Sequence, residues 1–194
     1  MKLYDITQEL FHSVVFPGDP APEYERLLQI KEGDPCNLTY VKMCAHNGTH
    51  LDAPCHFVDG AEGMEEVPLS KVMGSVDVIA WDGVLDGENA RKLLDGKEKR
   101  VLFKGNTVLT EEAAYEFIRQ GLVFAGVESQ TVGPVEQPEV VKEIHRILLG
   151  GRLVIGEGMV LKDVEEGPYF LCAQPLKLAG SDGAPCRAVL IDFE

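Results

Sequence analysis

The sequence has no closely paired cysteines, few basic residues and no long apolar run, and each absence excludes a class of protein. Its five cysteines are scattered without a Cys-x-x-Cys pair, so neither a disulfide scaffold nor a zinc finger is expected. Lys and Arg number 18 against 32 Asp and Glu, and the net charge of −14 repels the phosphate backbone of nucleic acids. No apolar run approaches the roughly 18 residues of a membrane span, and the first residues lack the basic flank and apolar core of a signal peptide. We therefore expect a cytoplasmic protein that binds neither nucleic acid nor membrane.

Length and composition are those of an ordinary globular domain. With 194 residues, of which 45 % are hydrophobic, the chain suits a single domain over residues 1–194. Short runs rich in β-branched and aromatic residues, bounded by Gly, Pro, Asp or Asn, predict strands. These runs lie at residues 2–7, 38–46, 76–81, 100–104, 122–127, 152–157, 169–178 and 187–192.

Two segments in the second half of the chain have the signals of helices. Segment 110–121 begins with Thr110, a favourable N-cap, and stops at Gly121. Segment 137–151 has Pro138 near its first helical position, and its apolar residues recur at a spacing of three and four. Many strands with few helices predict a mixed α/β fold whose central mixed sheet includes a barrel-like layer.

Histidine is also scarce, yet three of the five histidines fall in residues 44–57, CAHNGTHLDAPCHF. The stretch contains, in order, His46, Gly48, His50, Asp52, Pro54 and His56. A glycine and a proline so close together disfavour a helix. We therefore expect the histidines where a strand runs into a tight loop, with the glycine letting the backbone turn closely around an ion.

Imidazole nitrogens with a carboxylate are the usual ligands of zinc, and also suit manganese, iron or cobalt. His46, His50 and Asp52 supply such a set within seven residues. His56 is either a further ligand or a proton carrier beside the metal, because an ordinary imidazole pKa of about 6.5 suits proton transfer near neutral pH. The cluster therefore predicts a metal or catalytic site.

The string His46-x-Gly48-Thr49-His50-x-Asp52-x-Pro54-x-His56 resembles the signature of the metal-dependent, cyclase-like hydrolases. Bacterial kynurenine formamidases (arylformamidases) and isatin hydrolase belong to this family. The segments FPGDP at 16–20 and QPLKLAGSDGAPCRAVLI at 174–191 are also similar to segments of the family. The resemblance implies a swivelling β/β/α fold assembled as a homodimer or homotetramer.

The resemblance also implies the roles of individual residues. It gives one or two divalent ions per chain, with zinc as the first expectation and manganese as the second. One ion would be held by His46, His50 and Asp52, and a second would be completed by His145 and Glu157. His56 would be the general acid/base, and Phe16 and Asp19 would lie near the substrate at the pocket mouth.

For two of these residues, the surrounding sequence also supports an expectation without the resemblance. Glu157 follows the apolar run 153–155, where a carboxylate is costly unless it is paired or binds a cation. His145 lies beside Ile144 near the edge of a helical apolar stripe, and by itself is expected at the edge of the core or on the surface.

The function that these features predict is hydrolysis of a small amide C–N bond, with N-formylkynurenine as the candidate substrate. Opening of a cyclic amide, as in isatin hydrolase, needs the same groups and remains an alternative. A non-catalytic metal site is the alternative from a different class, although structural zinc usually has four closed ligands, often with Cys. The loop ESQTVGP departs from many kynurenine formamidases, because Gly133 stands near the position where they carry an acidic residue.

Overall fold

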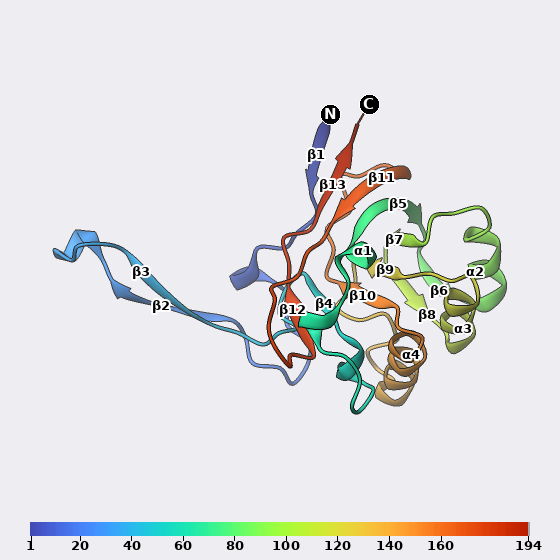
Figure 1. The fold of residues 1–194 in the computed structure, drawn as a ribbon, viewed down its shortest axis with the longest axis horizontal. Coiled ribbons are helices and arrows are strands. Elements are labelled where there is room, and N and C mark those ends of the chain that lie inside the picture. Colours follow the sequence, from blue (N-terminus) through green and yellow to red (C-terminus); the bar gives the residue numbers. More distant parts are fainter. Residues whose placement is uncertain (194) are drawn as a thin grey trace.

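The computed structural model describes residues 1–193, which fold around one nine-stranded mixed sheet (Figure 1). The strand order is β1-β13-β11-β5-β7-β9-β10-β4-β12. The strands are β1 (Lys2–Asp5), β4 (His50–Asp52), β5 (Met73–Ala80), β7 (Arg100–Lys104), β9 (Phe124–Val127), β10 (Val154–Glu157), β11 (Gly167–Cys172), β12 (Gly183–Pro185) and β13 (Val189–Asp192). The four central strands, β5, β7, β9 and β10, are parallel, and the strands on both flanks pair antiparallel. The sheet twists and curls into a half-barrel layer.

Two smaller sheets and four helices complete the fold. Strands β2 (Glu23–Leu28) and β3 (Leu38–Lys42) form an antiparallel hairpin, and β6 (Gly83–Leu85) pairs parallel with β8 (Thr107–Leu109). The helices are α1 (Leu69–Val72), α2 (Gly87–Leu93), α3 (Glu111–Arg119) and α4 (Pro138–Gly150). In Figure 1, α2, α3 and α4 lie together at one side of the sheet, whereas the β2–β3 hairpin projects from the opposite side.

The two predicted helices form where their end signals lie. The Thr110 side chain accepts a hydrogen bond from the Ala113 backbone N–H and caps α3, and Pro138 opens α4. Helix α4 buries Ile144 and Leu148 against the sheet. The sequence analysis did not predict α1 or α2.

The central strands are covered on both faces, which explains their continuous apolar runs. Along β7, Leu102 packs into one core cluster, whereas Val101 and Phe103 pack into the other, beneath the helices. The sheet is therefore fixed in place by a core on each side. Residues at the carboxyl end of β10 are held between these two cores.

The predicted fold class is confirmed: the chain is mixed α/β with a curled, barrel-like sheet and few helices. Every predicted strand run overlaps a strand, but β2, β4, β6, β8 and β12 were not predicted. The expectation of a loop is wrong for His50 and Asp52, which form β4. Three residues are too few for a visible alternating pattern, so pairing with β10 and β12 makes this strand. No helix within residues 1–193 has the length and apolar character that crossing a membrane requires.

Candidate metal centre

Strand β4 places two of the candidate ligands side by side. Successive side chains of a strand point to opposite faces, so His50 and Asp52 share one face and Leu51 takes the other. Leu51 is fully buried in the core cluster, which fixes the register of the strand. In the pairing with β10, His50 lies directly opposite Glu157. The carboxylate predicted to complete the site thus reaches it across the sheet.

Helix α4 brings His145 to the same point. The His145 side chain is 3 % exposed, so the expectation of an edge or surface position from the sequence pattern alone is wrong. Its Nε2 lies 3.3 Å from Glu157 Oε1 and 3.6 Å from Asp52 Oδ2. His50 Nε2 lies 3.4 Å from Asp52 Oδ1 and 3.4 Å from Glu157 Oε2. Two imidazoles and two carboxylates therefore converge, all of them buried.

The hydrogen bonds of the two histidine rings show which ligand atoms have no partner. The Nδ1 of His50 lies 2.9 Å from the Gly48 carbonyl oxygen, and the Nδ1 of His145 lies 2.7 Å from that of Val141. A carbonyl oxygen only accepts, so each Nδ1 carries a proton, and in the neutral form of each ring Nε2 presents its lone pair to the carboxylates. Among residues 1–193, His50 Nε2 and Asp52 Oδ2 are buried polar atoms without a hydrogen-bond partner. A cation between these lone pairs would satisfy all of them.

The spacing of the atoms fits a metal ion. The nitrogen–oxygen separations of 3.3–3.6 Å are long for hydrogen bonds. They are close to the separation expected of neighbouring ligands that each lie about 2.0–2.2 Å from one ion. The set His50, Asp52 and Glu157 and the set His46, Asp52 and His56 each place their ligand atoms within 4.8 Å of one another. The residues present therefore fit one or two divalent ions that share Asp52.

The electrostatics of the cluster also favour a cation. Burial disfavours the ionised form of Asp52, but the neighbouring His46 and His50 imidazoles outweigh it and hold the pKa of this carboxyl well below its usual value. Burial lowers the pKa of His50, yet Asp52 and Glu157 together raise it well above the ordinary 6.5. The two carboxylates thus stabilise positive charge in the site even though burial disfavours it. A divalent ion bound there would displace the protons of the imidazole nitrogens that it binds.

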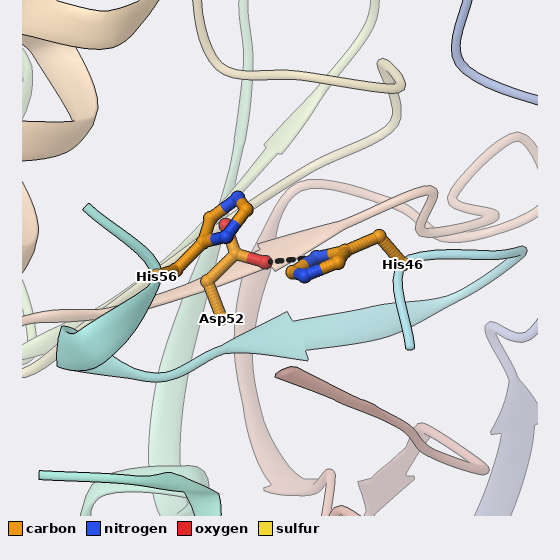
Figure 2. Close-up of side chains that lie close together, drawn as sticks. All are labelled: His46, Asp52 and His56. Atoms are coloured by element: carbon orange, nitrogen blue, oxygen red, sulfur yellow. Dashed lines mark hydrogen bonds and ion pairs between the residues drawn. The ribbon is translucent and has the colours of Figure 1, made fainter. Parts of the chain in front are cut away.

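His46 and His56 lie at the outer side of the cluster. Figure 2 shows the two rings flanking Asp52, with the His46 Nδ1 contact of 3.0 Å to Asp52 Oδ1 drawn as a dashed line. The rings of His46 and His56 stack, with centroids 4.1 Å apart. Burial lowers the pKa of His56, which lies on the short 3-10 helix Pro54–His56. This geometry leaves both roles of His56 open, ligand or proton carrier.

Asp182 is a site residue that the sequence analysis did not single out. Its Oδ2 lies 3.1 Å from His46 Nε2 and 3.2 Å from His56 Nδ1, so one carboxylate contacts both outer rings. The only sequence signal was its place in the segment SDGAP, between the predicted strands 169–178 and 187–192. Its distance along the chain concealed it, because His56 and Asp182 are 126 positions apart.

A cavity of about 320 Å³ opens onto the metal centre. It is lined by four of the histidines and Glu157, and also by the two residues predicted to lie near the substrate, Phe16 and Asp19. Gln130 and Thr131, which the sequence analysis missed, contribute Nε2 and Oγ1 atoms that are buried and without a partner among residues 1–193. These two side chains are therefore available to a bound molecule.

Gly133 packs closely against α4. A Cβ atom at this position would lie 3.1 Å from the Cα of Val141, so a side chain here requires the helix to give by a few tenths of an ångström. The same loop brings the Val132 backbone N–H to Glu157 Oε1, at 3.0 Å. The loop thus positions a candidate metal ligand through its backbone.

Comparisons with known proteins agree with this site. The sequence profile of the Cyclase family matches residues 4–94. A kynurenine formamidase from Bordetella petrii is 30 % identical over 209 aligned residues, which cover 97 % of each chain. A solved structure described as a potential metal-dependent hydrolase with cyclase activity is 29 % identical with a TM-score of 0.83, covering 100 % of this chain and 98 % of that one. Isatin hydrolase A from Labrenzia aggregata is 21 % identical with a TM-score of 0.85, covering 100 % and 94 %, and shows likeness of fold alone.

Proposed function

Because the chain belongs to the cyclase family of metal-dependent hydrolases, we propose that it hydrolyses the C–N bond of a small amide, with N-formylkynurenine as the first candidate substrate. The observation that carries the proposal is the buried set of unsatisfied ligand atoms at the floor of the cavity, with His56 beside it. The products would be kynurenine and formate. The similarity to a kynurenine formamidase over nearly the full chain supports this choice of substrate.

The proposed metal ligands are the residues that the sequence motif and the family resemblance predict. His46, His50 and Asp52 would bind one divalent ion, and His145 with Glu157 would complete the ligands of a second ion. Zinc is the first choice for nitrogen and carboxylate ligands, and manganese the second. When bound, the ion supplies an activated water at neutral pH and polarises the amide carbonyl. The Gly48 and Val141 carbonyls orient His50 and His145 for this task.

His56 would move the proton. Its Nδ1 faces Asp182, which leaves Nε2 as the atom that exchanges a proton with the cavity. An amine is a poor leaving group until it is protonated, so a positioned imidazole that accepts a proton from water and returns it to the leaving nitrogen speeds both stages. The lowered pKa of His56 keeps the ring neutral, and so able to accept that proton, at neutral pH.

The cavity sets the size and polarity of the substrate. A volume of about 320 Å³ lies at the lower end for small-molecule sites. Phe16 and Phe57 offer apolar ring faces to an aryl group, and the unpartnered Gln130 and Thr131 offer hydrogen bonds to its polar substituents. This combination suits a small aryl amide with polar substituents.

The purified protein is expected to carry one or two divalent ions per chain and to hydrolyse N-formylkynurenine faster than isatin. Metal content and turnover of both substrates are measured on the same preparation, before chelation, after chelation and after return of zinc or manganese. Chelation should remove the metal and the activity together, because the activated water depends on the ion. Full activity in metal-free protein would contradict the proposal. A tightly held metal with no turnover would favour the non-catalytic site, and preference for isatin would favour opening of a cyclic amide.

A further inference from the structure

Asp182 contacts both outer histidines through one carboxylate oxygen. Its Oδ2 lies 3.1 Å from His46 Nε2 and 3.2 Å from His56 Nδ1. An ionised carboxylate only accepts hydrogen bonds, so in each ring the nitrogen that faces Asp182 carries a proton. A neutral imidazole has one such proton, and its other nitrogen presents a lone pair. The lone pairs are therefore those of His46 Nδ1 and His56 Nε2, so one side chain selects the tautomer of both histidines.

We propose that Asp182 is a positioning residue that gives these two histidines their different tasks, an inference that rests on the proposed function. His46 would bind the divalent ion through Nδ1, since this nitrogen lies 3.0 Å from Oδ1 of Asp52, a member of the same ligand set. His56 would present Nε2 to the cavity, where a proton is exchanged. Asp182 itself stays outside the shell of the metal.

The two inner histidines, His50 and His145, are oriented through the opposite nitrogen. Each donates from Nδ1 to a backbone carbonyl oxygen, that of Gly48 and that of Val141. Each therefore presents Nε2 to the metal centre. Histidine ligands of metals almost always donate their other ring N–H to an acceptor of this kind. The acceptors thus predict a mixed set of ligand atoms, with Nδ1 from His46 and Nε2 from His50 and His145.

The chain holds Asp182 in place relative to the metal centre. The Ala53 backbone N–H donates to the Asp182 carbonyl oxygen at 2.8 Å. Directly after Asp182, strand β12 pairs with β4, and Gly183 lies opposite Asp52 in this pairing. The carboxylate is therefore attached to the strand pair that also carries a candidate metal ligand. The register of β12 with β4 sets its distance from the histidine rings.

Gly183 allows the His46 ring to lie against this segment. A Cβ atom at this position would lie 2.6 Å from His46 Cε1 and 3.0 Å from the Leu51 carbonyl oxygen. Cε1 is the ring carbon between the two nitrogens, one of which faces Asp52 and the other Asp182. A side chain in place of Gly183 would displace the ring from both carboxylates. The glycine therefore serves the same contact as the aspartate beside it.

Exposure separates Asp182 from the carboxylate that would bind the ions. The Asp52 side chain is fully buried, whereas that of Asp182 is 50 % exposed. Two sets of candidate ligand atoms lie within 4.8 Å of one another, and within residues 1–193 neither set includes Asp182. Asp182 is therefore placed to orient the ligand His46 and the proton carrier His56 without binding the ion.

The test is the ring nitrogen NMR spectrum of the Zn²⁺-loaded protein with ¹⁵N-labelled histidine, which shows which nitrogen of each ring carries a proton. His46 is expected to carry its proton on Nε2 and to bind the ion through Nδ1. His50 and His145 should carry theirs on Nδ1 and bind through Nε2. His56 should carry its proton on Nδ1 and bind no ion. The measurement uses the wild-type protein and needs no substrate.

Variants of Asp182 test whether this carboxylate is the cause. Asp182→Ala should release the His46 proton from Nε2 and lower the affinity for Zn²⁺ about 10–100-fold, the usual effect of losing a group that orients a metal ligand. Asp182→Asn keeps an oxygen that accepts from both rings, so it should retain the wild-type tautomers and most of the affinity. Asp59→Ala is the control, because it removes an exposed acidic side chain from the turn that follows His56 and should change neither quantity.

Three results would overturn the inference. The first is a wild-type spectrum in which His46 carries its proton on Nδ1. The second is an Asp182→Ala protein with wild-type tautomers and affinity. The third is an Asp182→Ala protein that is folded and binds no ion, which would make Asp182 a ligand. A wild-type protein that binds no ion refutes this inference and the proposed function together. One that binds Zn²⁺ with the expected tautomers but hydrolyses no amide refutes the proposed function alone.

Discussion

Asp52→Asn is expected to remove the metal and to reduce turnover by about 10³-fold or more. Asparagine keeps the shape of the side chain and removes the charge that His46, His50 and His145 all face. Mutation of a residue that only orients a metal ligand typically lowers metal affinity by about 10–100-fold. Loss of Asp52, a ligand that both ions would share, should lower the affinity further. The lost ion also carries several kcal/mol of transition-state stabilisation, and each 1.36 kcal/mol is a factor of about ten in rate.

Metal content after dialysis and the affinity for Zn²⁺ are the measurements for Asp52→Asn. His50→Ala should behave in the same way, because the unpartnered Nε2 of His50 points into the same set of ligand atoms. Glu139→Ala is the control, since this acidic side chain lies on α4 with His145 but is 88 % exposed. Full metal occupancy in either site variant would show that the ligand set is wrong. Equal loss in the control would point to general destabilisation instead.

His56→Ala is expected to keep its metal and its fold and to lose about 10²–10⁴ in kcat, the usual contribution of a general acid/base. Two contacts of His56 motivate this expectation. Its ring stacks on His46 at the outer side of the cluster, and its Nδ1 faces Asp182. Removing it should therefore leave the inner ligand atoms in place.

A change of substrate isolates the proton transfer. For an activated aryl ester, whose leaving group needs no proton, the loss caused by His56→Ala should shrink to a small part of its value for the amide. The measurements are kcat for both substrates and metal content for the same preparation. A fully active variant would make His56 a bystander, and a variant without metal would make it a ligand.

The sequence by itself determined what depends on short spacing along the chain. The helices α3 and α4 begin at Thr110 and Pro138 because caps and fixed backbone angles act on the nearest turn. His50 and Asp52 are two residues apart and share a face of β4 because side chains alternate along any strand. The central strands were visible because burial on both faces makes them apolar throughout. The grouping of His46, His50, Asp52 and His56 likewise needed only the chain order.

Tertiary structure alone decided which distant groups join that local set. Glu157 lies opposite His50 through the register of β10 with β4, and register depends on contacts between strands more than 100 residues apart. From its residue pattern alone, His145 was expected at the edge of the core or on the surface, and only the family resemblance implied a role in the site. The packing of α4 against the sheet buries it. Asp182 reaches His46 and His56 across 136 and 126 residues. The β2–β3 hairpin includes one predicted strand, β3, and one that was not predicted, β2, and only the structure shows that its strands are exposed. Such contacts depend on the packing of the whole chain and cannot be predicted from local sequence.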